Sequence, residues 1–171
     1  MPKQGDEILW TNARIHGKNK DKGRKEMPNE KKDTLYHALF LAQHLSKCDL
    51  QDGLVYILLE LQMPSHNIGY HYVRTAILLY YRDPVHMLMT GIYQLVGQTM
   101  DPSANYKQME QAIRFVINQA YKNCDPQVWG YYFQPRGTCK ARRPSNYEFI
   151  SQIASFMELW QACCKEVSYE I

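Results

Sequence analysis

The sequence predicts an all-α fold, a compact bundle of about six helices that contains a helix-turn-helix. The first observation behind this prediction is the helical spacing of apolar residues, which recurs in successive segments from residue 33 onward. The second is a pair of helix start signals, because Asn105 with Gln108 and Ser145 with Glu148 both have the spacing of a capping box. The most regular apolar stripe, which would lie on one helix face, consists of Met109, Ala112, Ile113, Val116, Ile117 and Ala120.

Three helices are predicted in the first half of the chain. The first covers residues 34–47 and starts after Asp33 or Thr34, either of which can cap a helix. The second starts at Asp49 and ends near Pro64, and the third follows directly. The residues expected to face inward are Leu35, Leu39, Ala42 and Leu45 in the first helix, Leu50, Leu54, Ile57, Leu58 and Leu61 in the second, and Tyr70, Val73, Ala76, Ile77 and Tyr80 in the third.

Three more helices are predicted in the second half. The fourth begins at Asp83-Pro84, where Asp can act as N-cap and Pro suits the first helical position. The fifth begins near Asn105, and the last covers about residues 145–160. Residues 129–139 alternate poorly and contain a Pro-x-Gly turn, so a short loop or hairpin is predicted before the last helix. The residues expected to face inward are Val85, Leu88, Met89, Ile92 and Val96 in the fourth helix and Phe149, Ile153, Phe156, Met157 and Trp160 in the last.

The chain length of 171 residues allows one domain with a tail. Residues 1–33 hold few apolar side chains among nine Lys/Arg and six Asp/Glu. Such a segment cannot bury enough apolar area to offset the entropy lost on folding, so we predict a flexible basic arm. Residues 34–48 are predicted to form an extra N-terminal helix, and residues 49–171 the domain that contains the helix-turn-helix.

Composition and motifs argue against several classes of protein. No apolar run approaches the roughly 18 residues of a membrane span, and the N-terminus has no secretory signal. The five cysteines and six histidines lack the spacing of a disulfide framework or a metal site, and no nucleotide-binding glycine loop is present. No Ser or Cys nucleophile has a recognisable partner arrangement. We therefore expect a cytoplasmic protein that is not an enzyme and needs no metal or cofactor.

The net charge of +3 is distributed unevenly along the chain. Residues 103–147 hold seven Lys/Arg and only two acidic residues, Glu110 and Asp125. A single basic segment in a nearly neutral protein suggests a local anionic partner. The alternative is a solvated face with ordinary variation in charge.

The outward face of the fifth predicted helix carries residue types that suit duplex DNA. Arg114 can bond guanine bidentately, and Gln111 and Asn118 can bond adenine. Glu110 can accept from cytosine, and Phe115, which is unusual on a solvated face, can contact a thymine methyl. Residues that would neutralise phosphates at the two ends of this face are Lys107 and Lys122. The alternative is an ordinary amphipathic helix.

A second basic cluster precedes the last predicted helix. The N–H groups at the start of that helix could seat a phosphate. The alternative is a flexible, solvated loop. The residues of this candidate phosphate site are Arg136, Lys140, Arg142, Arg143, Ser145 and Asn146.

Three sequence blocks carry a resemblance to a known family. They are Pro64-x-His66-x-x-Gly69-Tyr70-x-Tyr72-x-Arg74-x-Ala76-Ile77, Met109-Glu110-x-Ala112-Ile113-Arg114, and Lys140-Ala141-Arg142 followed by Pro144-Ser145-Asn146-x-Glu148-Phe149-Ile150. In this order, over about residues 50–160, they resemble the C-terminal DNA-binding domain of the stage-zero sporulation initiation regulator family of Firmicutes. The second block is similar to its recognition helix and the third to the entry of its last helix. The resemblance implies a helical fold with a helix-turn-helix and site-specific DNA binding that activates or represses transcription.

The sequence also departs from the family pattern. The family's regulator has an N-terminal phosphoacceptor receiver domain, and too few residues precede the match here to form one. Glu110 and Arg114 match the family's reading helix, but Gln111 and Phe115 stand where the family has Arg and His. The turn before this helix is about two residues longer. We expect DNA binding without phosphorylation-driven dimerisation and with a different target sequence.

Two functions from different classes follow from these observations. The first is a sequence-specific transcription regulator, whose expected partner is double-stranded DNA and whose further candidate partner is RNA polymerase. The second is a protein-interaction module of the same fold that modulates a full-length regulator without reading DNA. A homodimer through residues 34–47 is a further hypothesis, because that helix offers the apolar side chains Leu35, Leu39, Phe40, Ala42 and Leu45. No membrane partner is expected.

Overall fold

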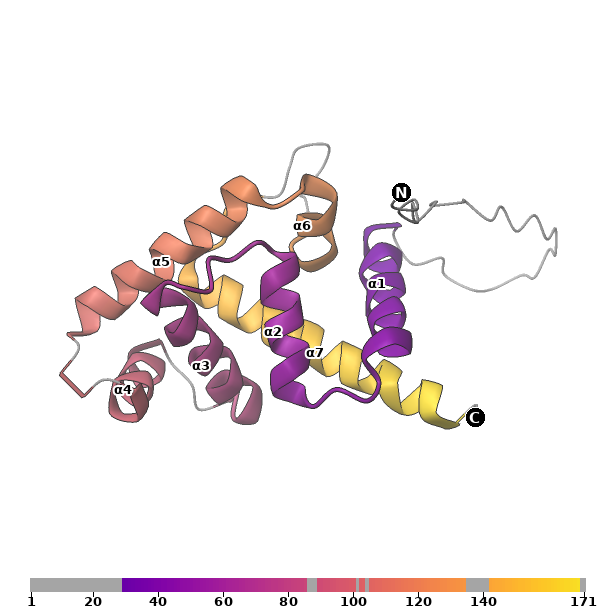
Figure 1. Ribbon diagram of the computed structural model, residues 1–171, viewed down its shortest axis with the longest axis horizontal. Helices are drawn as coiled ribbons and strands as arrows, with labels where there is room; N and C mark the ends of the chain where they lie inside the picture. Colours follow the sequence, from indigo (N-terminus) through magenta and orange to yellow (C-terminus); the bar gives the residue numbers. More distant parts are fainter. Residues whose placement is uncertain (1–28, 86–88, 101, 104, 135–141, 170–171) are drawn as a thin grey trace, which may run out of the picture.

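A computed structural model describes residues 29–85, 89–100, 102–103, 105–134 and 142–169. These residues form seven α-helices and no strand, which confirms the predicted all-α fold (Figure 1). Most of the predicted basic arm, residues 1–28, lies outside the described residues. The helices are α1 (Asn29–Leu45), α2 (Leu50–Glu60), α3 (Ile68–Arg82), α4 (Met89–Met100), α5 (Tyr106–Asn123), α6 (Pro126–Tyr132) and α7 (Asn146–Tyr169).

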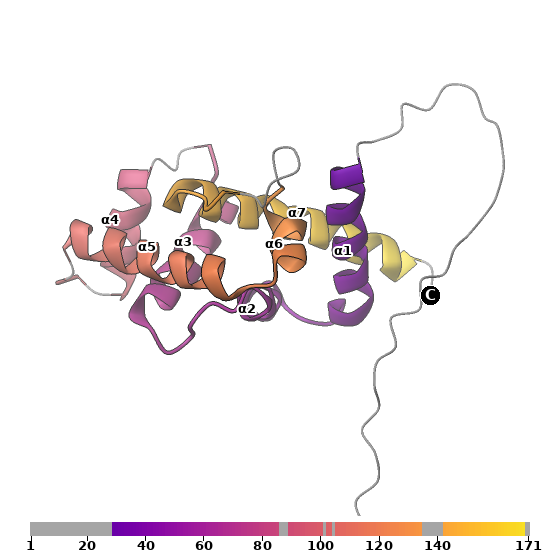
Figure 2. The same cartoon turned by 90° about the horizontal axis from the view of Figure 1, so that it is seen from above.

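The last helix, α7, is the element around which the others pack. It has 24 residues and contacts α1, α3, α5 and α6 along its length. Figure 2 shows α1 and α4 toward opposite ends of the molecule, with α7 running along most of its length and ending beyond α1. All five side chains of α7 that were predicted to face inward, Phe149 through Trp160, are buried. No described helix is both long and apolar enough to cross a membrane.

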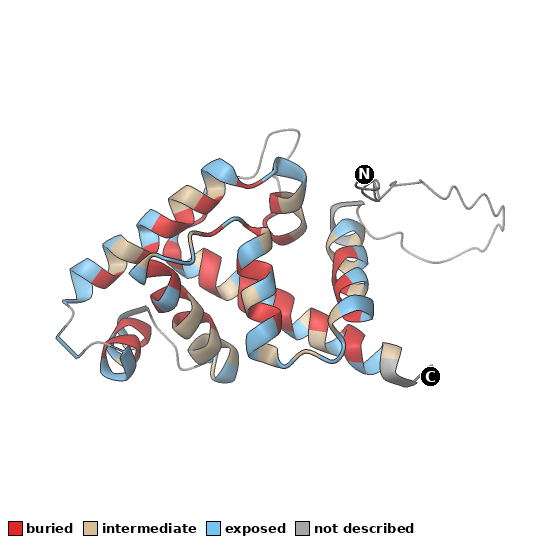
Figure 3. Ribbon diagram, in the orientation of Figure 1, coloured by how far each residue is buried: buried red, intermediate tan, exposed pale blue. Residues whose placement is uncertain are grey.

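The predicted apolar stripe of α5 is also confirmed. Met109, Ile113, Val116, Ile117 and Ala120 are buried and Ala112 is half-buried, while the other side of the helix faces solvent (Figure 3). The predicted capping box starts the helix: the Asn105 side chain accepts from the Lys107 N–H at 3.0 Å, and the Asn105 N–H donates to Gln108 at 3.2 Å. Local sequence therefore sets both the start and the orientation of α5.

The fourth helix starts later than predicted. Asp83 is the C-cap of α3, and its N–H makes the last helical hydrogen bond, to the Leu79 carbonyl at 3.3 Å. The helix ends here because the residue before a proline is disfavoured in helical conformation. Val85, predicted to face inward, is 85% exposed. The side chains of Leu88 and Met89 lie outside the described residues, whereas Ile92 and Val96 are buried as predicted.

The segment predicted as a loop or hairpin begins with a helix instead. Asp125 caps α6 by accepting from the Gln127 N–H at 2.7 Å, and Pro126 occupies the first helical position. Trp129 and Tyr132 of this helix are buried. The poor alternation thus reflects a short helix with two inward aromatic residues. The Pro135–Gly137 turn lies outside the described residues.

The extra N-terminal helix, α1, is longer than predicted and packs on the rest of the domain. It begins at Asn29, and its side chains Ala38, Leu41 and Ala42 are at most 1% exposed against α6 and α7. The surface expected to pair two copies is therefore largely occupied within one copy. Leu35, Leu39 and Leu45 are partly buried against the same core, and Tyr36 and Phe40 are the large apolar side chains of α1 that remain exposed.

Candidate nucleic-acid interface

Helices α4 and α5 form the predicted helix-turn-helix. A connection of residues 101–105 joins them, and they pack against each other (Figure 1). The rings of Tyr93 in α4 and Tyr106 in α5 meet edge to face, with centroids 4.8 Å apart. At the C-terminal end of α4, a Cβ added to Gly97 would lie 3.2 Å from Met109 Cε. Contacts with α4 thus hold α5, the second helix of the helix-turn-helix, along its inner face.

The inner face of α5 is also held by the start of α3. A Cβ added to Gly69 would lie 2.2 Å from the backbone oxygen of Ala112 and 3.1 Å from Val116 Cγ1. Only glycine allows the backbones of the two helices to approach this closely. The outer face of α5 therefore projects from a rigid support.

The outer face carries the side chains predicted to contact DNA bases. Gln111, Arg114 and Phe115 are exposed, and Glu110 and Asn118 are half-buried. The guanidinium of Arg114 lies 3.5 Å from the Glu110 carboxylate, and 56% of the Arg114 side chain is accessible. Such an exposed pair contributes at most about 1 kcal/mol, so Arg114 is able to exchange it for another acceptor. The exposed lysines at the two ends of the face are Lys107 and Lys122.

The basic segment that precedes α7 lies beside this face. Arg143 donates from Nη1 to Asn118 Oδ1 at 3.3 Å, and Arg142 contacts the Glu148 carboxylate. Both arginines are exposed. Arg136 and Lys140 of the same cluster lie outside the described residues. The structure therefore brings a residue predicted to contact bases, Asn118, next to one predicted to contact phosphates, Arg143, although they are 25 positions apart in the sequence.

The start of α7 is a capping box, as predicted. The Ser145 N–H donates to Glu148 Oε2 at 2.8 Å, and the Glu148 N–H donates to Ser145 Oγ at 3.2 Å. The backbone hydrogen bond from Ser145 is the main cause that lowers the pKa of Glu148, with smaller contributions from the Ser145 hydroxyl and Arg142. The helix terminus already holds a carboxylate, so a phosphate near Ser145 would compete with Glu148.

Replacing Glu148 with glutamine tests the charge at this terminus. Glutamine keeps the capping-box geometry, so we expect Glu148→Gln to lower the free energy of unfolding at neutral pH by less than about 1 kcal/mol. Because the pKa of Glu148 is lowered in the folded state, the stabilisation is present above the ordinary carboxylate range and is lost as the pH falls through the lowered value. Urea unfolding of both proteins over a pH series should show the difference closing only at acidic pH. A difference that is independent of pH would contradict this assignment.

Asn146 has a different role from the predicted phosphate contact. Its side chain is 6% exposed, and Nδ2 donates to Tyr93 Oη at 2.8 Å and to the Glu110 backbone oxygen at 3.1 Å. Burial raises the pKa of Tyr93, and the hydrogen bond from Asn146 partly offsets this effect. A buried amide with both N–H groups engaged is incompatible with a direct phosphate contact, so we exclude Asn146 from the phosphate site. Sequence reasoning missed Tyr93, for which the sequence carries no local signal.

Comparison with known proteins supports a family assignment. A family model described as "Sporulation initiation factor Spo0A C terminal" matches residues 54–157. The match contains α3, α4, α5 and α6 whole, with most of α2 and the first half of α7, and leaves out α1. All the residues of the candidate interface fall within it. A search of curated proteins finds no match to the chain.

Proposed function

The chain belongs to the family of sporulation initiation factor Spo0A C-terminal domains, which are DNA-binding effector domains, and on this premise we propose that it is a sequence-specific transcription regulator. In this proposal α5 enters the major groove of duplex DNA, whose width admits one α-helix. Glu110, Gln111, Arg114, Phe115 and Asn118 contact base edges. These five residues are the ones proposed to recognise the DNA target sequence.

The observation that carries the proposal is the outer face of α5 beside the basic segment. Gln111, Arg114 and Phe115 are exposed on a helix whose opposite face is buried, and Arg143, the neighbour of Arg142 in the chain, bonds Asn118 on this helix. A recognition helix needs both features, since phosphate contacts fix the register in which side chains meet the bases. Lys107, Lys122, Arg142 and Arg143 are proposed as the phosphate contacts, with Arg136 and Lys140 as further candidates. Ser145 would contact a phosphate only where the phosphate replaces the Glu148 carboxylate.

The proposed base contact of Arg114 can be tested on a site selected from a random duplex pool. Arg114→Ala should weaken binding to the selected site by about 1–3 kcal/mol and relax the preference at one base position. The fold should be little affected, because the side chain is exposed. Affinities are measured on the selected duplex and on a scrambled one at the same salt concentration.

A matched control for Arg114→Ala is Arg82→Ala. Arg82 is exposed in the last turn of α3, about 20 Å along that helix from the point where Gly69 meets α5. Arg82→Ala should leave both affinities unchanged. Equal losses on both duplexes for Arg114→Ala would make Arg114 a phosphate contact. Failure of the wild-type protein to enrich any site would favour the protein-interaction module instead.

Arg142 should behave as a phosphate contact. Arg142→Ala should weaken binding to the selected and scrambled duplexes by the same factor, since phosphates carry no sequence information. The slope of log affinity against log salt should become shallower by about one. Fluorescence anisotropy titrations from low to physiological salt measure both quantities. A loss confined to the selected duplex would assign Arg142 to base reading.

The location and the further partners are part of the same proposal. A transcription regulator acts where the chromosome is, and we therefore propose a cytoplasmic location. Contact with RNA polymerase stays a prediction. Pairing of two copies through residues 34–47 also stays a prediction, and it is now restricted to the exposed side chains Tyr36 and Phe40.

A further inference from the structure

The amide of Asn146 connects three helices at one buried point. Asn146 is the first residue of α7, Tyr93 belongs to α4 and Glu110 to α5. The Asn146 side chain is 6% exposed and that of Tyr93 is 2% exposed. Both helices of the helix-turn-helix therefore bond to the same side chain, which neither helix contains.

The chemistry of the partners fixes the orientation of this amide. The Glu110 backbone oxygen can only accept, so the atom 3.1 Å from it must be the donor Nδ2. The same nitrogen donates to Tyr93 Oη at 2.8 Å, and both amide N–H groups are thereby used. A helix carbonyl has a second lone pair, so the bond from Asn146 does not displace the hydrogen bond within α5. Turning the amide over would lose the contact with Glu110, because two acceptor oxygens would then face each other.

A second contact aligns the basic segment with α5. Arg143 bonds Asn118, which lies eight positions beyond Glu110 and hence about 12 Å further along the helix. Residues 143–146 therefore run beside α5 in the opposite direction, with Asn146 bonded near the first turns of α5 and Arg143 bonded in its second half. Arg143 is exposed, whereas Asn146 is buried, so the Asn146 contact is the rigid one of the two.

We propose that Asn146 is a positioning residue for base reading, which holds α5 in register with the phosphate-contacting segment without touching DNA. This inference rests on the function proposed above. Base edges and phosphates lie at fixed spacings in one groove, and bidentate hydrogen bonds require accurate placement of the side chain. A shift of α5 against Arg142 and Arg143 therefore costs base contacts while the cationic surface remains intact.

Two variants test this role. Asn146→Ala removes the amide, and Tyr93→Phe removes one of its acceptors while keeping the ring that packs on Tyr106. Asn146→Ala should lower affinity for the selected duplex by about tenfold, comparable with the loss of one base contact, and leave the scrambled duplex nearly unchanged. Tyr93→Phe should shift the ratio of the two affinities in the same direction by a smaller factor. The salt slope should not change, because no cation is lost.

A buried control separates positioning from general destabilisation. Leu41→Ala opens a cavity in α1, at the end of the molecule remote from α4, and should lower stability while keeping the ratio of selected to scrambled affinity (Figure 2). All affinities are measured at a temperature where circular dichroism shows each variant folded. If Asn146→Ala does not fold, Tyr93→Phe carries the test.

Three results would contradict the positioning role of Asn146, and one of them would also contradict the proposed function. An unchanged ratio for Asn146→Ala, or for Tyr93→Phe when it alone folds, would refute the positioning role while site-specific binding stands. A ratio lowered equally by Leu41→Ala would also refute it, because the effect would then follow from lost stability. If the wild-type protein itself does not distinguish the two duplexes, the proposed function fails and the positioning role fails with it.

Discussion

Replacing Gly69 with alanine is expected to lower the free energy of unfolding by about 3 kcal/mol, the upper end of the usual cost of overpacking. The added Cβ would lie 2.2 Å from the Ala112 backbone oxygen, a distance that no pair of real atoms of these kinds adopts. A flexible side chain could turn aside, but a helix backbone cannot. Helices α3 and α5 would have to move apart, and the buried contacts of Ile113 and Val116 would loosen.

A matched control for this substitution is Gly91→Ala. A Cβ added to Gly91, in α4, meets no atom within 4 Å, so the change should be neutral or stabilise by up to about 1 kcal/mol. Urea unfolding followed by circular dichroism measures both variants. Equal stabilities would show that α3 and α5 are further apart than the structure places them. Because α5 carries the proposed base contacts, Gly69→Ala should also lower affinity for a selected duplex more than for a scrambled one.

The sequence predicted the starts and the inward faces of α5 and α7 well because their signals are local, whereas α7 continues to Tyr169, beyond the end predicted near residue 160. In each case a capping residue and its partner lie three positions apart, and the inward stripe follows from helical periodicity alone. The outward face of α5 then follows from the same geometry. This is why the exposure of Gln111, Arg114 and Phe115 could be inferred without a structure.

The Asp-Pro dipeptides show where local signals are ambiguous. Asp125 and Pro126 start α6, whereas Asp83 and Pro84 end α3. The dipeptide favours the beginning of a helix after it and the end of a helix before it, since Asp can cap and the residue before Pro avoids helical conformation. At α6 the helix forms after the dipeptide because it buries Trp129 and Tyr132. That burial depends on distant parts of the chain.

The contacts that hold the candidate site could not be predicted for the same reason. Asn146 is 53 positions from Tyr93 and 36 from Glu110. No local pattern indicates such partners. Asn146 was predicted as a phosphate contact because it stands at a helix start beside basic residues. Gly69 belongs to a block that resembles the family, but only the structure shows that it meets α5.

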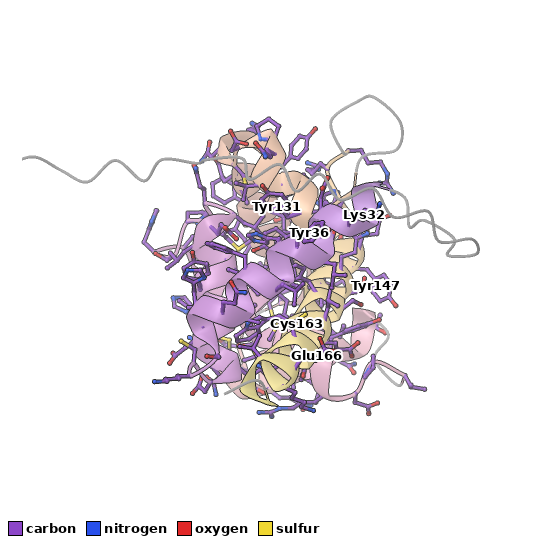
Figure 4. The ribbon with its side chains drawn as sticks, turned by 90° about the vertical axis from the view of Figure 1, so that its right-hand side faces the viewer. Lys32, Tyr36, Tyr131, Tyr147, Cys163 and Glu166 are labelled. Carbon is purple, nitrogen blue, oxygen red and sulfur yellow. The ribbon has the colours of Figure 1, made fainter. Side chains whose placement is uncertain are left out.

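A buried polar cluster joins α1 to the remainder of the domain, and its partners are equally far apart in sequence. His37 Nε2 lies 3.0 Å from Glu60 Oε2 and 3.1 Å from Tyr132 Oη, and the Tyr132 hydroxyl donates to the same Glu60 oxygen. Burial, and then the charge of Glu60, raise the pKa of Tyr132, so this hydroxyl stays protonated and remains a donor. The ring of His37 stacks on Tyr131 with centroids 4.3 Å apart. Figure 4 shows this end of the molecule, with Tyr36 on α1 and Tyr131 on α6.

Replacing His37 with alanine should therefore lower the free energy of unfolding by about 3 kcal/mol, through a cavity between aromatic rings and the loss of a hydrogen bond to Glu60. The neighbouring Tyr36 is 66% exposed and provides the control, since Tyr36→Ala should cost less than about 0.5 kcal/mol. Urea unfolding measures both variants. Similar small effects would mean that α1 does not pack on α6 and α7 in solution. Because α1 lies outside the family match and away from α5, folded His37→Ala should keep the ratio of selected to scrambled DNA affinity, in contrast to Gly69→Ala.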